Sequence, residues 1–335
     1  MRLSLLVLSL ALLHAVATLP AQVAGLTTLS NPSIAFTRPS KPYVILKRGD
    51  VEAVIVDNSA VNDEVLSDHR AGYSGLALLR HRARKENLFV SRYSGLNFEH
   101  IISGVASTEN KIQFEPRNHP MELRVIHEHA VELCQTPTFH HALESCQRYE
   151  LLEDGVIQLT VEVSPRNATF PHGYINLFWA SYINQPESLD IHFQGLPAND
   201  AATQAPSWIR GVTPSHGELS THPAVDDKRD FPHDKPFPLT LVFSLSNYRY
   251  TQPWYYAVSH GMAFVQMFRP KDRVRFSQSP SGGGVGNPAW DFQFFAENAQ
   301  VNQVYQFVMR AAYLPYRSPE QIEEAMRTHR MELTQ

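Results

Sequence analysis

Short segments that alternate apolar and polar residues follow one another along most of the chain, and they constrain the fold more than any other feature. Clear examples are residues 51–58, 156–165, 174–183 and 304–316, with Gly, Pro, Asn or Asp between neighbouring segments. Side chains of a β-strand alternate between two faces, so this pattern predicts strands joined by turns. The chain is therefore expected to be all-β and antiparallel.

Residues 111–116 and 238–245 also have strand character, and we expect strands there too. Helical signals are confined to short pieces around 76–84 and to the C-terminal tail. In the tail, Ser318, Pro319 and Glu320 predict the start of a short helix. Ser caps a helix, Pro suits its first position, and acidic residues suit its first turn.

The N-terminus reads as a signal peptide over residues 1–17. Arg2 supplies the positive charge, residues 3–13 form an apolar run, and residues 15–17 have the small-residue pattern of a cleavage site. No later apolar run is long enough to span a bilayer, so we expect no membrane insertion. The product is predicted to be secreted or periplasmic.

The remaining residues, 18–335, are expected to form one domain, because no internal boundary stands out. Residues 197–238 are rich in Pro, Asp, His and Ser and have little apolar periodicity, so we interpret them as a long insertion. It either shapes a binding site or is a surface excursion with no role. The formal net charge of −4 is small and interspersed, which argues against a nucleic-acid partner.

Two cysteines remain in this region, Cys134 and Cys146. They lie in segments with strand character on either side of a short connection, so antiparallel pairing would bring the two sulfur atoms together. An oxidising compartment permits a disulfide, and two buried free thiols are the alternative.

The run from Pro171 to Asn184 carries the strongest functional signal. If it is a strand, His172, Tyr174 and Asn176 share one face, while Ile175 and Leu177 share the other. A row of polar side chains beside aromatic rings suits a sugar, whose hydroxyls need hydrogen-bond partners and whose C–H faces stack on rings. The alternative is an amphipathic strand whose polar face is only exposed to solvent and binds nothing.

The string His172-Gly173-Tyr174-Ile175-Asn176-Leu177 resembles the galactose mutarotase (aldose 1-epimerase) superfamily, whose members often carry His-x-Tyr-Phe-Asn-Leu in mid-chain. An earlier histidine, His100, and late carboxylates, Asp291 and Glu297, agree in order. The resemblance implies a β-supersandwich of two large antiparallel sheets with one concave face.

The resemblance also implies roles for these residues. His172 would be the acid that protonates the sugar ring oxygen, and His100 would help to bind the sugar. Either Glu297 or Asp291 would be the base. The family's Asn-Arg pair has no clean counterpart here, and Arg92, Tyr93 and Asn97 offer the same chemistry in another order.

Further candidates come from aromatic and polar residues near the C-terminus. The glycine-rich segment 279–287 lacks a phosphate-binding signature, and we expect it to let the backbone approach a ligand or another loop closely. Trp290 beside Asp291 would be a stacking platform. The complete set of predicted substrate-binding residues is Arg92, Tyr93, Asn97, Tyr174, Asn176, Trp179, His260, Arg275 and Trp290.

No standard zinc spacing or EF-hand loop is present, so no metal and no cofactor are expected. Three classes of function stay open: a sugar-active enzyme of the epimerase, glycosidase or lyase type, a noncatalytic carbohydrate-binding protein, and a structural envelope protein. A glycosidase needs two carboxyl groups across its cleft, and Glu99 with Asp291 is the predicted pair. The sequence leaves the oligomeric state open.

Overall fold

The computed structural model describes residues 27–107, 109–199, 205–237 and 240–335. The predicted signal peptide, residues 1–17, lies outside these ranges. Among the described residues, no helix has the length and apolar character needed to cross a bilayer.

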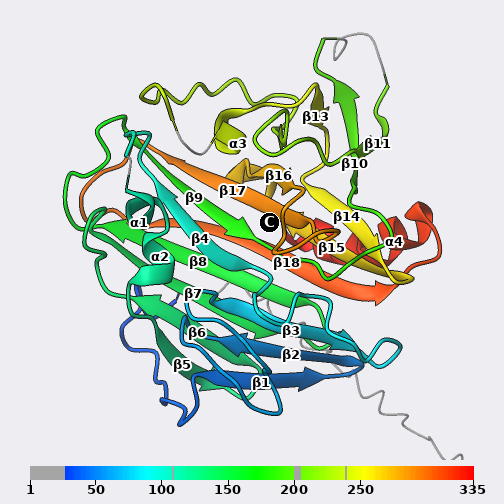
Figure 1. Cartoon of the computed structure of the whole chain (residues 1–335), viewed down its shortest axis with the longest axis horizontal. Helices are drawn as coiled ribbons and strands as arrows, with labels where there is room; N and C mark the ends of the chain where they lie inside the picture. The colour runs from blue at the N-terminus through cyan, green and yellow to red at the C-terminus, as the bar shows by residue number, and fades with distance from the viewer. Residues whose placement is uncertain (1–26, 108, 200–204, 238–239) are drawn as a thin grey trace, which may run out of the picture.

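The largest element is a ten-stranded antiparallel sheet with the order β11-β10-β14-β15-β18-β8-β7-β6-β5, in which β13 also pairs with β10 (Figure 1). Its strands are β5 (Glu122–His127), β6 (Ala130–Gln135), β7 (Leu143–Leu151), β8 (Ile157–Pro165), β10 (Ile191–Pro197), β11 (Ser207–Gly211), β13 (Tyr248–Tyr250), β14 (Trp254–Ser259), β15 (Met262–Phe268) and β18 (Tyr305–Pro315).

Two smaller sheets face it. One has five strands in the order β12-β16-β17-β9-β4, and the other has three in the order β1-β2-β3. Their strands are β1 (Tyr43–Arg48), β2 (Val51–Val56), β3 (Gly75–His81), β4 (Asn97–Ile102), β9 (Tyr174–Ala180), β12 (Thr221–His222), β16 (Arg275–Ser279) and β17 (Ala289–Glu297). Every pairing between these named strands is antiparallel.

The main core fills the space between the layers. Trp179 of β9 is fully buried there, with Phe98 of β4 stacked 4.7 Å away and Phe292 of β17 stacked 5.4 Å away, measured between ring centroids. Large apolar side chains from both layers continue this cluster, as expected for packed sheets. The predicted all-β antiparallel sandwich is confirmed.

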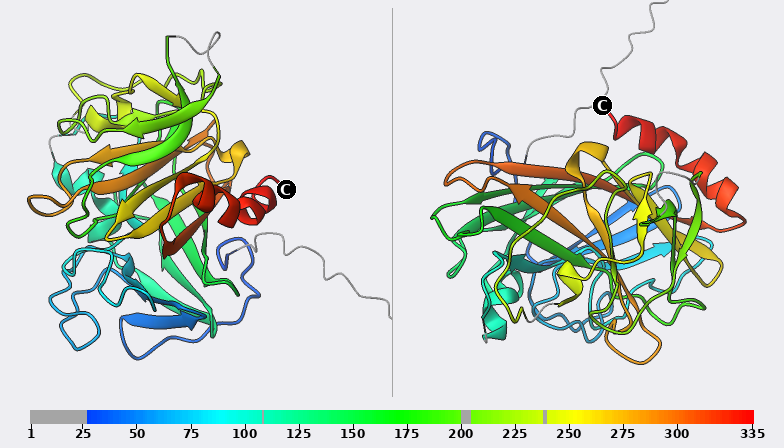
Figure 2. Two further views of the ribbon diagram at one scale, coloured as in Figure 1. Left: turned by 90° about the vertical axis from the view of Figure 1, so that its right-hand side faces the viewer. Right: turned by 90° about the horizontal axis from the view of Figure 1, so that it is seen from above.

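The C-terminal tail forms two short helices, α4 (Pro319–Ala325) and α5 (Arg327–Glu332). The Ser318 hydroxyl accepts a hydrogen bond from the Gln321 N–H and caps α4, as predicted. Ile322, Met326 and Leu333 pack on the outer face of the ten-stranded sheet, and Figure 2 shows the helices lying against that side.

Three local predictions were wrong. The piece around 76–84 is mostly strand β3, whose leucines are buried on both faces, so no strand alternation was visible in the sequence. The segments 111–116 and 238–245 contain single helical turns rather than strands. These turns are α1 (Asn110–Gln113), α2 (Glu115–Asn118), which has Pro116 in its first turn, and α3 (Thr240–Phe243); a further turn, η1 (Pro270–Asp272), follows β15.

The stretch 197–238 is not only a surface loop, because it contributes strands to two of the sheets. Strand β11 extends the edge of the ten-stranded sheet beside β10, and β12 extends the five-stranded sheet beside β16. Phe231 and Phe237, which follow β12, then pack on the outer face of the five-stranded sheet, the face opposite the main core.

Candidate functional site

The outer face of the five-stranded sheet is built by the alternation of β9. Ile175, Leu177 and Trp179 point into the main core, whereas Tyr174 and Phe178 belong to a separate cluster on the outer face. The predicted division of this strand into two faces is therefore present. His172 is an exception, because it lies in the turn before the strand.

Strand pairing places further polar residues on the same face. Asn97 of β4 lies opposite Ala180, Gln293 of β17 lies opposite Phe178, and Ser277 of β16 lies opposite Asp291. All of these polar side chains are buried. The outer face thus has a polar floor at the end of β9 that carries Ala180.

Asp291 is the most perturbed acid on this floor. Its Oδ1 accepts a hydrogen bond from the Ser181 N–H at 3.2 Å, and none of the described residues donates to its Oδ2. Burial, and next the negative charge of Glu99, raise the pKa of Asp291 well above its ordinary range. Asp291 therefore favours the protonated form, in which it can donate a proton.

Glu99 lies at a bulge of β4, between Phe98 and His100. Its Oε1 accepts hydrogen bonds from Arg117 Nη2 at 2.7 Å and from the Tyr182 hydroxyl at 2.9 Å. Arg117 comes from α2, the helical turn beside β4 in Figure 1. Glu99 is therefore held as the anion of a nearly buried ion pair.

His100 lies beside this ion pair, with its Nε2 3.5 Å from Glu99 Oε1. Its Nδ1 is 3.1 Å from the Gln113 carbonyl oxygen, which can only accept, so Nδ1 carries the proton. Burial lowers the pKa of His100 to about 4. The ring is therefore neutral near pH 7, and Nε2 is an acceptor.

Three tyrosines form an aromatic group over the polar floor. The ring centroid of Tyr93 is 4.4 Å from that of Tyr73 and 5.2 Å from that of Tyr182. The Arg117 guanidinium carbon lies 4.3 Å from the Tyr73 centroid. Rings held in this way offer flat apolar faces next to charged and polar groups.

The glycine-rich segment supports this aromatic group. A Cβ atom at Gly283 would lie 2.0 Å from the Tyr93 ring, so only glycine lets the backbone pass so close. The close approach predicted for this segment is therefore made to another loop, the one that carries Tyr93.

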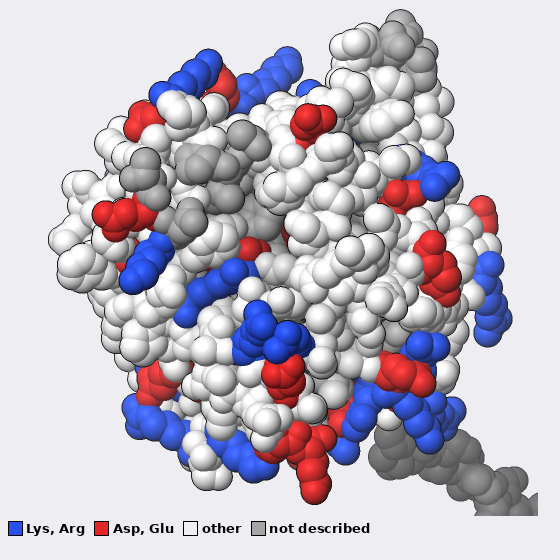
Figure 3. Space-filling model, viewed as in Figure 1, with Lys and Arg blue, Asp and Glu red and all other residues white. Residues whose placement is uncertain are grey.

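Several buried polar atoms around the floor have no partner among the described residues. They are both amide atoms of Asn97, the Oδ1 of Asn176 and the Nε of Arg117. Buried polar groups without partners usually mark a place for water or a ligand. Figure 3 shows a hollow near the middle of this face, over β9 and β17 in the view of Figure 1, with acidic atoms visible inside it.

We call Glu99, His100, Arg117, Tyr182 and Asp291 the carboxylate cluster. Sequence reasoning had selected Glu99, His100 and Asp291 but missed Arg117 and Tyr182. For Tyr182 a signal existed, because the alternation that begins at Tyr174 reaches residue 182. For Arg117 there was none, since a loop and two helical turns bring it to Glu99.

The other end of the sheet face holds His172 and Glu297, and it is filled. His172 Nε2 is 3.2 Å from Asp234 Oδ1, and Glu297 pairs with Tyr174 in the sheet. Phe231 occupies the space beside them, stacked on Phe295 with 3.9 Å between ring centroids. Phe231 therefore covers the part of this end of the sheet face that carries Phe295.

His172 is also far from Asp291. Six residue steps separate Tyr174 from Ala180, which corresponds to roughly 20 Å of extended strand, and His172 lies beyond Tyr174. The expectation that His100, His172 and Asp291 meet in one hollow is therefore wrong. His100 and Asp291 lie toward one end of the face, and His172 lies at the other.

Four predicted binding residues have different positions from those expected. Trp179 and Trp290 are fully buried in the main core, so neither is a stacking platform. His260 lies in the exposed turn between β14 and β15, with a positive φ of 52°. The Arg275 guanidinium is engaged by the buried Asp227 carboxylate at 3.0 Å.

The remaining predicted binding residues surround the face. Asn97 and Asn176 belong to the polar floor, Tyr93 to the aromatic group, and the Tyr174 hydroxyl donates to the Pro232 carbonyl at 3.0 Å. Arg92 forms an exposed ion pair with Asp68. Cys134 and Cys146 are joined by a disulfide on the ten-stranded sheet, away from this site.

Comparisons with known proteins give structural neighbours only. No family model and no curated protein matches the sequence. A candidate aldose 1-epimerase from Escherichia coli K12 aligns at 10% identity and a TM-score of 0.47, over 84% of this chain and 100% of that chain. A galactose mutarotase related enzyme from Lactobacillus acidophilus aligns at 9% identity and a TM-score of 0.39, over 81% of this chain and 97% of that chain.

A heparan sulfate lyase from Pedobacter heparinus aligns at 11% identity and a TM-score of 0.38, over 86% of this chain and 37% of that chain. Proteins of the aldose 1-epimerase and galactose mutarotase type are thus among the structural neighbours. Scores and identities at this level assign no residue role, so the function is argued from the chain's own geometry.

Proposed function

We propose that this protein binds an uncharged carbohydrate at the carboxylate cluster and transforms it by acid–base chemistry at the anomeric centre. One observation carries the proposal: two carboxyl groups on one sheet face have opposite environments. Asp291 is favoured as the acid by burial, and Glu99 is an anion paired with Arg117. Pairs of this kind supply a proton donor and a proton acceptor at the same pH.

The surroundings fit a sugar. The free amide of Asn97 can pair with hydroxyls, and Tyr73 and Tyr93 present rings for the C–H faces. The charges of Glu99 and Arg117 cancel, burial favours the uncharged form of Asp291, and His100 is neutral near pH 7. A site without net charge favours an uncharged substrate over an anionic one.

Glu99 would take the proton from the attacking or anomeric hydroxyl, and Asp291 would give one to the ring or leaving oxygen. Tyr182 and Arg117 hold the Glu99 carboxylate in place through two hydrogen bonds to one oxygen. This division serves either epimerisation or hydrolysis. His172 and Glu297, at the filled end of the face, take no part.

The test begins with a glycan array probed with the chain from residue 18 onward, followed by NMR anomer exchange and reducing-end assays on each hit. Asp291→Asn should lower turnover by at least about 100-fold, the usual contribution of a general acid. The substitution keeps the shape of a group whose uncharged form is favoured by burial, so the fold should persist. Glu99→Gln should have a similar effect on turnover.

His172→Gln and Glu297→Gln serve as matched controls and should leave turnover unchanged. Full activity in Asp291→Asn and Glu99→Gln, with their circular dichroism unaltered, would refute the acid–base assignment. Binding without turnover in the unaltered protein would replace the enzyme by a noncatalytic sugar-binding protein.

We further propose that the protein is exported. The leader-like residues 1–17 support this, and so does the Cys134–Cys146 disulfide, because disulfides persist mainly in oxidising compartments. Fractionation of expressing cells, with N-terminal sequencing of the product, tests both the location and the cleavage near residue 18.

A further inference from the structure

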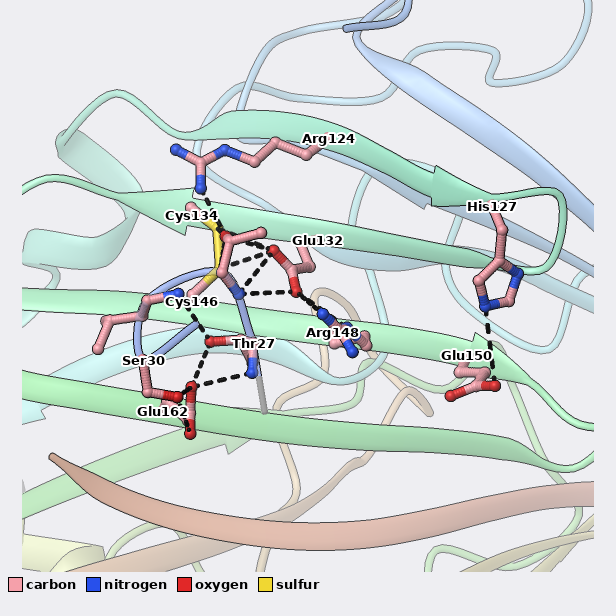
Figure 4. A network of polar contacts seen from close by, with 12 residues as sticks. Thr27, Ser30, Arg124, His127, Glu132, Cys134, Cys146, Arg148, Glu150 and Glu162 are labelled. Carbon is pink, nitrogen blue, oxygen red and sulfur yellow. Dashed lines mark hydrogen bonds and ion pairs between the residues drawn. A yellow bond between two sulfur atoms is a disulfide. The ribbon is translucent and has the colours of Figure 1, made fainter. Parts of the chain in front are cut away.

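A second group of reactive side chains lies on the outer face of the ten-stranded sheet, outside the carboxylate cluster. Cys134 of β6 and Cys146 of β7 are direct partners in the sheet, and their sulfur atoms are bonded (Figure 4). Both cysteines line a cavity of about 430 Å³ beside the chain segment that contains Thr28.

Glu132 points toward these two sulfurs from the strand that carries Cys134. It is fully buried, and its Oε1 accepts two hydrogen bonds from Arg148 at 2.9 and 2.6 Å. Its Oε2 lies 3.3 Å from the Cys146 sulfur and 3.8 Å from the Cys134 sulfur. A disulfide has no proton to share, so this oxygen faces two sulfur atoms without a hydrogen bond between them.

The Thr28 hydroxyl completes the group. Its oxygen lies 3.7 Å from the Cys134 sulfur and 3.5 Å from the Cys146 sulfur, and it donates to Glu132 Oε2. The ligand atoms of Glu132, Cys134 and Cys146 all lie within 4.8 Å of one another. Zinc bonds of about 2.0–2.3 Å in a tetrahedron place neighbouring donor atoms roughly 3.5 Å apart. The observed contacts from oxygen to sulfur match this spacing.

We propose that Glu132, Cys134 and Cys146 bind one zinc ion once the disulfide is reduced, with Thr28 or a water molecule as the fourth ligand. An external dithiol supplies two electrons and two protons and becomes a disulfide itself, while Cys134 and Cys146 become thiols. Zinc then displaces the two thiol protons. The sulfur atoms separate from bonding distance to ligand spacing, and the Glu132 Oε2 atom already lies near ligand spacing from the Cys146 sulfur.

Local charge supports a cation there. Two thiolates and the Glu132 carboxylate would bring three negative charges into a nearly buried group. Arg148 contacts Glu132 and offsets one of these charges, whereas Arg124, which donates to the Thr28 hydroxyl at 2.6 Å, is already paired with Glu122. A divalent ion supplies the remaining neutralisation, as is usual for thiolate sites.

The sequence did not suggest this site. Glu132 and Cys134 are separated by one residue and Cys146 follows twelve later, which is not a known zinc spacing. The cluster arises only because β6 and β7 pair with Cys134 opposite Cys146. The expectation of no metal rested on spacing along the chain, and strand pairing creates a different spacing in space.

The experiment reduces the full chain with a phosphine, which leaves as phosphine oxide and does not compete for zinc. Zinc is then titrated against a chromophoric chelator. The reduced protein should bind about one zinc ion per chain, and the oxidised protein should bind none at this site. Cys146→Ser should abolish binding. Glu132→Gln should weaken it by at least about tenfold.

Glu144→Gln is the matched control, because Glu144 lines the same cavity but pairs with Arg166 instead of facing the sulfurs. It should leave zinc binding unchanged. If Glu132→Gln fails to fold, cobalt binding to the unaltered protein decides: thiolate-to-cobalt absorption should appear only after reduction. Absence of zinc binding to the reduced protein, or full binding in Cys146→Ser, would overturn the proposal.

Discussion

At the scale of single residues, the environment of a side chain decides its role more than its identity does. Asp291 and Glu99 are both carboxylic acids on one face, yet burial raises the pKa of the first, whereas the second forms an ion pair with Arg117. Trp179 and Tyr182 are three positions apart, and one fills the core while the other contacts Glu99. Alternation along the strand produces this difference.

Gly283 gives a residue-scale prediction. Its replacement by alanine would push a methyl group into the Tyr93 ring, so the ring must move and sugar affinity should fall by about tenfold or more. Gly286→Ala is the control, since Gly286 also has positive φ but its new Cβ would meet nothing within 4 Å. Isothermal titration with a sugar hit measures both, and equal affinities would contradict the role of Tyr93.

At the scale of elements, the segment after β12 is fixed to the five-stranded sheet by a buried ion pair. The Asp227 carboxylate, which is fully buried, contacts Arg229 at 2.8 Å and Arg275 of β16 at 3.0 Å. The pKa of Asp227 is lowered to about 2; burial opposes this shift, and hydrogen bonds and positive charge from the two arginines outweigh it. This contact holds Phe231 over the filled end of the face.

Arg275→Met should therefore destabilise the protein by about 3 kcal/mol, because it leaves part of a buried charge unpaired. Arg273→Met is the control: Arg273 pairs with Asp226 on the surface, and its loss should cost less than about 1 kcal/mol. Urea unfolding of both variants measures the difference. Equal free energies of unfolding would mean that the buried pair contributes nothing.

The sequence predicted elements well where the signal was local. The two faces of β9, the cap at Ser318 and most strands follow from alternation and capping within a few residues. It failed for β3, because burial on both faces removes the alternation. It could not show that Phe231 covers the sheet beside His172, since that contact joins distant segments. For the same reason the sequence did not indicate Arg117, and it wrongly placed His172 in the same hollow as His100 and Asp291.

At the scale of the whole molecule, two buried histidines link folding to pH. Burial lowers the pKa of His100 to about 4 and that of His222 to about 4, against about 6.5 in an unfolded chain. Between these values the unfolded chain binds protons that the folded protein does not. Stability from this source is complete above about pH 6.5 and is lost as the pH falls toward 4.

The expected loss is at most roughly 3 kcal/mol per histidine. Asp291 has the opposite effect on the pH dependence of stability because its pKa is raised. The contribution of each histidine must therefore be measured by comparing variants. Urea unfolding at pH 7 and pH 4.5 should show a smaller change for His222→Gln than for the unaltered protein. His260→Gln, at an exposed turn, should show the same change in unfolding free energy between the two pH values as the unaltered protein. An equal change in all three proteins would contradict the prediction.

The segment that begins at Thr27 has a practical consequence for handling the protein. The Thr27 amide and hydroxyl and the Ser30 hydroxyl all donate to Glu162, and the Thr28 amide donates to Glu132. Both glutamates are buried beneath this segment. A polypeptide trimmed past Thr27 for crystallisation would strip hydrogen-bond donors from Glu162 and uncover it, so any shortened version should start upstream of that threonine.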